Sequence, residues 1–525
     1  MLSTITLFLL CLIIRSFPRY MRPYAINFDT YFHLIQGREI RKNKFHIPEN
    51  NPQAVLPHVN SYPFLYHFIL ALFSDKNRLV AERYTGAFFE CINTALIFGF
   101  SKYLYNTGYL HYLFAPHIIA LFYIFWPALT RSNYGPRTYN GSPRIMAQCF
   151  YIIHIVASAI GLINNDIFFF VISLLFGALL IFTAKFALQV LVFFSVPFIC
   201  FFNYKYSYLL VLSVLLSFIL YPKLAGRIIK GYIEFIHFYF KYTREYHEYL
   251  KISKIKEGIK YLKEIASFIK KTFQGKLKPG RLIHWFFQNN FFIHLLFTAQ
   301  FQFVFLLSIF PFIGLPESPL LLFIWIWVLA GFSLYVLTNI KILNLLGEPE
   351  RYLEYATFPS LILLFYYLSD NNFIILSIIM LYCFLFTIYN IYHFNKTNNN
   401  EEYFSYQRLF NQLNNYKEGC VWPLVNYWQA LYFSKFQIVC FGSNYSEKYI
   451  SGEEFKLLYE NYPWPSGKFN EILNRYNVRY IVATKDMLEY YFEGIVKNKE
   501  SCYDRLSLII DGPKYCAWEI MQGHD

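Results

Sequence analysis

The feature that most constrains this chain is a series of long apolar segments separated by short polar turns. A helix needs roughly 20 predominantly apolar residues to cross a bilayer, and several of these segments approach that length. Only 15% of the 525 residues are charged and 56% are hydrophobic, which leaves too little charge to cover a soluble protein of this size. We therefore predict a polytopic α-helical membrane protein with about ten or eleven spans.

The apolar segments predict a multi-span domain over residues 1–394. A retained first helix is expected over 1–14 and is followed by a long polar loop over 18–80, where 63–73 is too short to span the membrane. Further spans are expected at 84–104, 112–129, 144–163, 166–183, 186–202, 207–221, 290–313, 319–341, 356–369 and 372–391.

The remaining residues, 395–525, are predicted to form a small soluble α/β domain that begins with a polar linker. Runs of β-branched and aromatic residues indicate strands at 436–441, 478–483 and 506–510. This tail also holds four cysteines, which would permit two disulfides in an oxidising compartment or remain as four buried thiols: Cys420, Cys440, Cys502 and Cys516.

Positive charge is concentrated in the segment 222–289, which holds fifteen Lys or Arg and five Glu. Isoleucines and leucines recur there at helical spacing among the lysines, a pattern typical of a helix that lies in the lipid headgroup layer. This pattern favours membrane lipids, and anionic headgroups in particular, as partners. No nucleic-acid-binding motif accompanies it, so we expect no nucleic acid partner.

The first loop contains the strongest candidates for chemistry, Asp29 and His33. If residues 28–42 are helical, the two side chains share one face at a spacing of four residues. A carboxylate beside the lipid boundary could remove a proton from a hydroxyl group, with its pKa tuned by the low dielectric. The simpler alternative is that Asp29 caps the start of that helix.

A second loop, residues 130–144, is cationic and rich in turn residues. Its arginines, which include Arg137 and Arg144, match the geometry of phosphate oxygens, and its glycines would allow a close backbone approach. The alternative is the positive flanking that is common beside membrane helices. The loop contains no Asp or Glu, so a set of metal ligands and dependence on a divalent cation are not supported there.

Three further charged residues lie close to expected spans. Lys185 stands between two short apolar segments, where it could bind a ligand or reach the interface from a helix end. Glu350 and Arg351 belong to an expected charged loop over 347–352, as an internal ion pair or as ligand-binding groups.

The stretch Phe28-Asp29-Thr30-Tyr31-Phe32-His33-Leu34, with Arg38 and then Ser61-Tyr62-Pro63-Phe64-Leu65, resembles the first external loop of GT-C glycosyltransferases. Glu350-Arg351-Tyr352 is similar to a charged loop that precedes a late span in this class. The resemblance implies a polyprenyl-phosphate-sugar donor, a glycan, lipid or protein acceptor, and inverting transfer to an acceptor hydroxyl. It further implies that Asp29 is the catalytic base and favours contact of Arg351 with the donor phosphate. We also predict substrate-binding roles for His33, Arg137, Arg144, Lys185 and Glu350.

Two departures limit what the resemblance implies. The oligosaccharyltransferase signature WWDYG is absent, so transfer to an asparagine sequon is not expected. A lipid-linked saccharide transporter, polymerase or ligase remains the alternative function, because such proteins share the many spans and the cationic loops. Counting spans from an inside N-terminus places the candidate residues and the tail on the extracytoplasmic side, together with the basic 222–289 segment, against the positive-inside rule.

Overall fold

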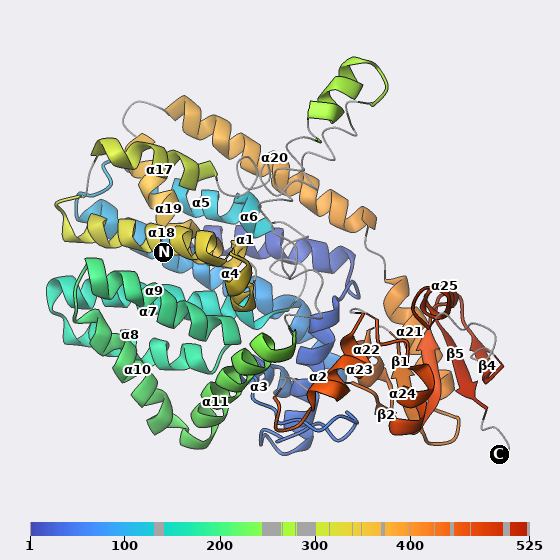
Figure 1. Ribbon diagram of the computed structural model, residues 1–525. Coiled ribbons are helices and arrows are strands. Elements are labelled where there is room, and N and C mark those ends of the chain that lie inside the picture. The colour runs from blue at the N-terminus through green and yellow to red at the C-terminus, as the bar shows by residue number, and fades with distance from the viewer. Residues whose placement is uncertain are drawn as a thin grey trace. The chain divides into compact units, whose positions relative to one another are not determined.

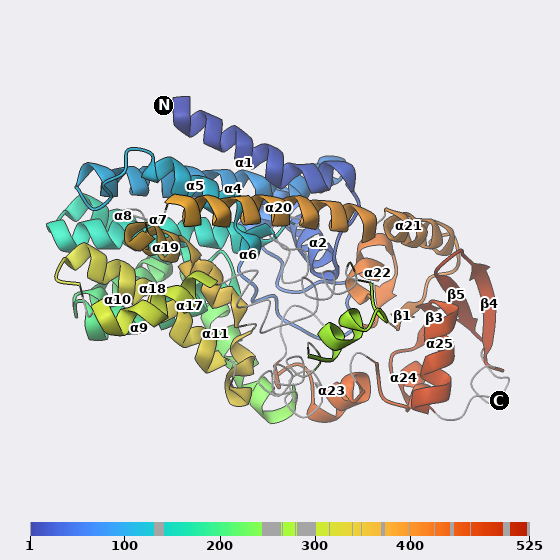
Figure 2. The same cartoon turned by 90° about the horizontal axis from the view of Figure 1, so that it is seen from above.

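The computed structural model describes residues 2–130, 141–243, 264, 266–278, 280, 301–313, 316–338, 340–347, 349–368, 373–397, 400–424, 426–440, 446–461, 464–496 and 504–521. The chain forms two compact units, which are drawn in Figures 1 and 2. Unit 1 comprises Met1–Met21, Arg83–Pro222 and Ile252–Thr397, and unit 2 comprises Arg22–Glu82, Lys223–Lys251 and Asn398–Asp525.

Unit 1 is built from helices, many of which run side by side (Figures 1 and 2). Its α-helices are α1 (Leu2–Met21), most of α4 (Asp75–Asn106), α5 (Ala115–Phe125), α6 (Pro127–Thr130), α7 (Pro143–Asn164), α8 (Ile167–Ile181), α9 (Lys185–Phe201), α10 (Tyr206–Leu220), α17 (Phe301–Ile313), α18 (Pro319–Thr338), α19 (Glu350–Leu368) and α20 (Phe373–Thr397). A 3₁₀ helix, η3 (Lys341–Leu346), precedes α19.

Several of these helices are apolar along much of their length. Four helical stretches among the described residues are long and apolar enough to cross a membrane: Ser3–Met21, Pro143–Asn164, Pro319–Thr338 and Ile374–Leu413. Four more apolar helices, α5, α8, α9 and α10, are shorter. The predicted helical architecture is therefore confirmed, with an uneven distribution of helix lengths.

The structure corrects two boundaries that matter for the site. The first helix continues to Met21 and so contains Arg15 and Arg19, which the sequence suggested lie beyond it. The expected charged loop at 347–352 is wrong in its second half, because α19 begins at Glu350. Pro349 directly precedes this helix, and a helix start tolerates a neighbouring proline because the first amides need no intrahelical acceptor.

Unit 2 combines the first loop with the C-terminal tail. Its helices are α2 (Phe28–Lys42), α3 (Leu65–Ala71), α11 (Pro222–Phe238), α21 (Glu401–Leu413), α22 (Tyr427–Phe433), α23 (Gly452–Tyr459), α24 (Phe469–Arg475) and α25 (Lys485–Tyr490), with π-helical turns η1 (Tyr239–Thr243) and η4 (Tyr491–Val496). Its strands are β1 (Cys420–Pro423), β2 (Gln437–Ile438), β3 (Val478–Ala483), β4 (Leu506–Asp511) and β5 (Cys516–Ile520).

The five strands form one mixed sheet in the order β2-β1-β3-β5-β4. β1 pairs in parallel with β2 and β3, whereas β5 is antiparallel to β3 and β4. The three expected strand regions are all present, and the sequence missed β1 and β5. Cys420, Cys440 and Cys516 are free thiols, and Cys502 lies outside the described residues, so the alternative of buried unpaired thiols holds for those three.

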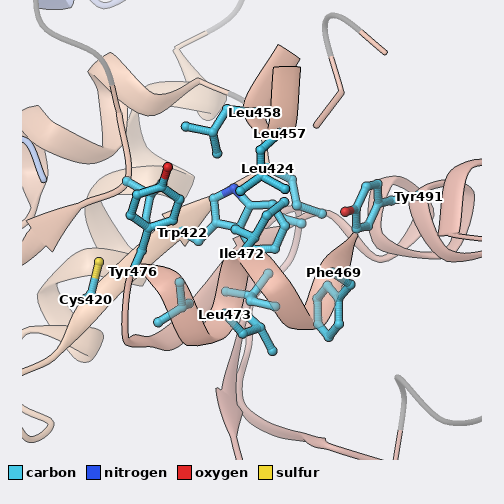
Figure 3. Packing of buried hydrophobic residues seen from close by; sticks show 14 of the residues in the cluster. Cys420, Trp422, Leu424, Leu457, Leu458, Phe469, Ile472, Leu473, Tyr476 and Tyr491 are labelled. Atoms are coloured by element: carbon cyan, nitrogen blue, oxygen red, sulfur yellow. The ribbon is translucent and has the colours of Figure 1, made fainter. Parts of the chain in front are cut away.

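Both faces of the unit 2 sheet pack against a hydrophobic core. Successive side chains of a strand point to opposite faces, so a strand such as β3 contributes to both cores. In β3, Ile481 belongs to a core with Trp422, Phe469 and Ile472, which Figure 3 shows in part. The neighbouring Tyr480 and Val482 belong to a second core. That second core also contains Tyr31, Phe32 and Ile35 of α2, so the first loop supplies part of the packing of the sheet domain.

Candidate functional site

The first turns of three unit 1 helices, α7, α9 and α19, meet at one end of the bundle. The Nε2 group of Gln148 in α7 donates to the carbonyl oxygen of Glu354 in α19 (3.0 Å). The ring centroids of Phe186 in α9 and Tyr352 in α19 are 4.7 Å apart, and the Tyr352 hydroxyl lies 3.4 Å from Oε1 of Gln189. The amino-terminal end of a helix carries partial positive charge, so three such ends together favour an anion.

Four of the candidate residues occupy these helix starts. Arg144 lies in the first turn of α7, Lys185 is the first residue of α9, and Glu350 and Arg351 begin α19. All four are half-buried. The guanidinium carbon of Arg351 lies 5.9 Å from the ring centroid of Phe186, the residue next to Lys185. Three cations that are far apart in the sequence and one carboxylate therefore lie at the starts of helices that contact one another.

A buried polar group in the same bundle was missed by the sequence analysis. Arg15, Arg19 and Glu90 are each only 1% exposed. Arg15 donates from Nη1 to the carbonyl oxygen of Leu129 (3.1 Å) and from Nη2 to that of Tyr123 (3.4 Å). The Tyr123 hydroxyl in turn donates to Oε2 of Glu90 (3.1 Å).

A sequence signal for this group does exist. Glu90 falls inside an expected apolar span, and a charge in such a position is costly unless it has a purpose. Lys185 was predicted to have a role on this ground, whereas Glu90 was not. The buried group binds the carboxyl-terminal ends of α5 and α6, which precede the predicted cationic loop at residues 130–144.

An apolar groove of about 460 Å³ lies between α5 and α20 within unit 1. Its lining includes Ile118, Leu121, Phe125, Leu376, Met380 and Phe384. Near one end of it, the Thr387 hydroxyl donates to the carbonyl oxygen of Phe125 (3.1 Å). The groove therefore borders the stretch of backbone, from Tyr123 to Leu129, that Arg15 binds.

In unit 2, Asp29 lies in the first turn of α2 with its side chain exposed. The capping alternative is wrong for this residue, because the N-cap is Asn27, whose Oδ1 accepts from the Thr30 amide (3.0 Å). Within the described part of the chain, the Asp29 carboxylate makes no hydrogen bond or ion pair. An exposed carboxylate that the helix does not use for capping is available to a substrate.

His33 lies one turn further along α2 and is buried. Its Nδ1 lies 2.8 Å from Nε2 of His67 in α3, and the two rings are stacked. Burial lowers the pKa of His67 to about 3, so this ring stays neutral at physiological pH. Asp29 and His33 lie four residues apart on α2 as predicted, but Asp29 is exposed whereas His33 is buried against His67.

Arg137 lies outside the described residues, so its predicted role stays a prediction. No group of three His, Cys, Asp or Glu side chains that could hold a metal ion occurs in the described part of the chain. Independence from a metal cofactor likewise stays a prediction.

Comparisons with known proteins agree with this architecture. No protein-family model and no curated protein matches the sequence. The crystal structure of the Archaeoglobus fulgidus oligosaccharyltransferase, tethered to an acceptor peptide with the NVT sequon, is similar with a TM-score of 0.53. It is 12% identical, and the match covers 99% of this chain and 74% of that one. The chain has a GT-C-like fold.

ArnT from Cupriavidus metallidurans in the apo state matches less closely, with a TM-score of 0.43 and 9% identity over 98% of this chain and 97% of that one. At identities this low, the likeness to the oligosaccharyltransferase concerns the fold. The likeness confirms the fold that the resemblance implied.

Proposed function

We propose that this protein is a membrane glycosyltransferase that moves a sugar from a polyprenyl-phosphate-linked donor to an acceptor hydroxyl, with inversion at the anomeric carbon. The observation that carries the proposal is that Arg144, Lys185 and Arg351 lie in the first turns of α7, α9 and α19, three helices joined by the Gln148–Glu354 and Phe186–Tyr352 contacts. A GT-C-like fold supports a transferase of this kind. The proposal includes an integral membrane location with the site on the extracytoplasmic side.

The cationic helix starts suit the phosphate group of the donor. As the bond between the sugar and the phosphate breaks, negative charge grows on the phosphate oxygens, and nearby cations and helix amino termini stabilise that charge. Arginine is suited to this contact because its planar fork binds two oxygens at once. Glu350 beside Arg351 would help to orient the guanidinium.

The apolar groove between α5 and α20 suits the hydrocarbon part of such a donor. Its lining is almost entirely apolar, and it borders polar residues at the carboxyl-terminal end of α5. A lipid whose tail occupies the groove would therefore have its polar head directed toward the part of unit 1 that holds Arg15 and Tyr123.

Asp29 is the proposed base. Its carboxylate takes the proton of the acceptor hydroxyl, the hydroxyl oxygen forms a bond to the anomeric carbon, and the bond from that carbon to the phosphate oxygen breaks. The polyprenyl phosphate leaves with the electron pair of that bond. A single displacement of this type inverts the anomeric centre. Asp29 is exposed and does not cap α2, because Asn27 does, and both facts support this role.

The test is transfer by the purified, reconstituted full-length chain. The protein is incubated with radiolabelled polyprenyl-phosphate sugars and candidate glycan, lipid and peptide acceptors, and the products are separated. We expect one sugar to be added per acceptor and free polyprenyl phosphate to be released. Movement of the donor across the vesicle membrane without sugar transfer would favour a transporter. Addition of many sugars to one acceptor would favour a polymerase, and transfer of a whole saccharide would favour a ligase.

Asp29→Asn tests the base within the same assay. Loss of general-base catalysis typically costs roughly 10²- to 10⁴-fold in rate, and we expect transfer to fall by at least that factor. Glu453→Gln is the matched control, because Glu453 is an exposed carboxylate in the first turn of another unit 2 helix, α23. Full activity of the Asp29→Asn variant would remove the assignment.

A further inference from the structure

Three consecutive helices of unit 1 are unusually short for membrane spans. α8 and α10 have 15 residues each and α9 has 17, whereas α18 has 20. At about 1.5 Å per residue, α8 and α10 are roughly 22 Å long, against a hydrocarbon core of about 30 Å in a typical bilayer. The shortfall is repeated in adjacent helices, so it is a property of a whole sector of the unit.

Polar residues limit α8 at its start and α10 at both ends. Asp166 caps α8 by accepting from the amide of Phe168 (2.9 Å), after a turn closed by Asn165 in the left-handed conformation (φ 53°). Asn203 and the exposed Lys205 precede α10, and the exposed Lys223 follows it. A short capping carboxylate cannot reach far along the membrane normal, so the polar boundary of α8 is set by its backbone.

The outer faces of these helices are apolar and exposed. On α8 they present Ile167, Val171 and Leu175, and on α10 they present Val211, Leu215 and Ile219, each set at a spacing of four residues. Residues at that spacing form a stripe along one side of a helix. Such stripes are expected to contact acyl chains, and the helices that carry them here are only about 22 Å long.

We propose that the α8–α10 face is matched to a locally thinned bilayer and that its partner is a belt of lipid with short or compressed acyl chains. A span shorter than the surrounding hydrocarbon can be accommodated by thinning, by long flanking side chains or by association with another copy. The short Asp166 side chain excludes adjustment by a long flanking side chain at the start of α8, and of the two remaining adjustments we propose thinning. This inference rests on the proposed membrane location and does not depend on the proposed chemistry.

Thinning would also affect access to the candidate site. The turn between α8 and α9 ends at Lys185, so a thinner bilayer at this face brings lipid headgroups closer to the end of the bundle where α7, α9 and α19 begin. A lipid phosphate would then travel a shorter distance through hydrocarbon to reach the cations. This consequence alone rests on the proposed function.

The test is an electron cryomicroscopy map of the full chain in nanodiscs of phosphatidylcholine with 18-carbon monounsaturated chains. The separation between the two headgroup layers is measured at the α8–α10 face and, as an internal control, at the face of α20 that exposes Ile374, Ile378 and Leu381. We expect the separation to be smaller by roughly 5–8 Å at α8–α10. Equal separations, or a second copy covering the face, would overturn the inference.

A lipid-selection experiment gives an independent result. The chain is reconstituted in an equal mixture of phosphatidylcholines with 14- and 22-carbon chains and extracted in small polymer-bounded discs. We expect the short-chain lipid to be enriched in the discs relative to the whole membrane. An unchanged ratio would count against thinning, whereas failure of the chain to insert at all would contradict the proposed membrane location instead.

Discussion

Charged residues have different surroundings in the two units of this protein. In unit 1, Arg15 and Glu90 are only 1% exposed and bond to backbone carbonyls and to a tyrosine hydroxyl. In unit 2, Arg479 pairs with Glu519 across neighbouring strands (2.9 Å), and about a third of each side chain remains exposed. Arginine and glutamate side chains are therefore shielded from water in unit 1 and partly hydrated in unit 2.

Burial determines how much each charged residue matters for the free energy of unfolding. A buried ion needs polar partners that offset its loss of hydration, whereas a surface pair exchanges readily with water. Substitutions should therefore have large effects in the unit 1 polar group and small effects in the surface pairs of unit 2.

Arg15→Gln should have the largest effect on stability. It leaves the carbonyl oxygens of Leu129 and Tyr123 without their charged donor in a buried place, which we expect to cost about 3 kcal/mol. The measurement is the free energy of unfolding in detergent. An unchanged value would show that water reaches this end of the bundle, and the contrast between the units would fail.

Arg351→Gln should affect activity more than stability. If the guanidinium stabilises the leaving phosphate, transfer should fall roughly 100-fold, with little change in the thermal midpoint because Arg351 is only half-buried. Arg408→Gln, which removes an exposed arginine of α21, is the control and should retain activity. Equal activity of both variants would argue against phosphate binding at the start of α19.

His67 predicts a pH dependence of stability within unit 2. Its pKa is lowered by burial to about 3, so the unfolded chain, with a histidine pKa of about 6.5, binds the proton more strongly. The contribution of the neutral ring is fully present above about pH 6.5 and is lost as the pH falls toward 3. Between pH 6.5 and 5 the loss should be about 2 kcal/mol.

The His67 prediction is checked by denaturant unfolding at several pH values. His67→Gln should flatten the slope between pH 5 and 6.5, whatever its effect on stability at neutral pH. A slope as steep as that of the wild type would assign the dependence to another group.

Arg479→Gln should have the smallest effect. The pair with Glu519 is partly exposed, and such pairs typically contribute less than about 1 kcal/mol. We expect a small decrease in unfolding free energy that shrinks further at high salt. A loss as large as that of Arg15→Gln would abolish the distinction between the two units.

Much of the local structure was predictable because local patterns set it. The helix over residues 28–42 has the predicted bounds, and the strand at 478–483 was recognised from its β-branched and aromatic run. β1 and β5 were not recognised, because strands of four and five residues carry little pattern of their own. They are strands because β3 lies between them and supplies the pairing on both sides.

Less of the candidate site was predictable. The types of residue that matter, cations near helix ends and a carboxylate in the first loop, were recognised singly. Glu90 could have been recognised as a charge inside an expected span, but its contact with Tyr123 could not, because one charge in an apolar run does not specify its partners. Asn27 took the capping role considered for Asp29 because its side chain, two residues earlier, reaches the Thr30 amide.

The amino-acid sequence by itself determined the apolar helical character of the chain and the positions of its main polar interruptions, because hydrophobic burial and helix formation depend on residues a few positions apart. Only the tertiary structure decided that the starts of α7, α9 and α19 meet and that the first loop packs with the C-terminal sheet. Contacts such as that between Gln148 and Glu354 join residues 206 positions apart, and no local preference specifies them.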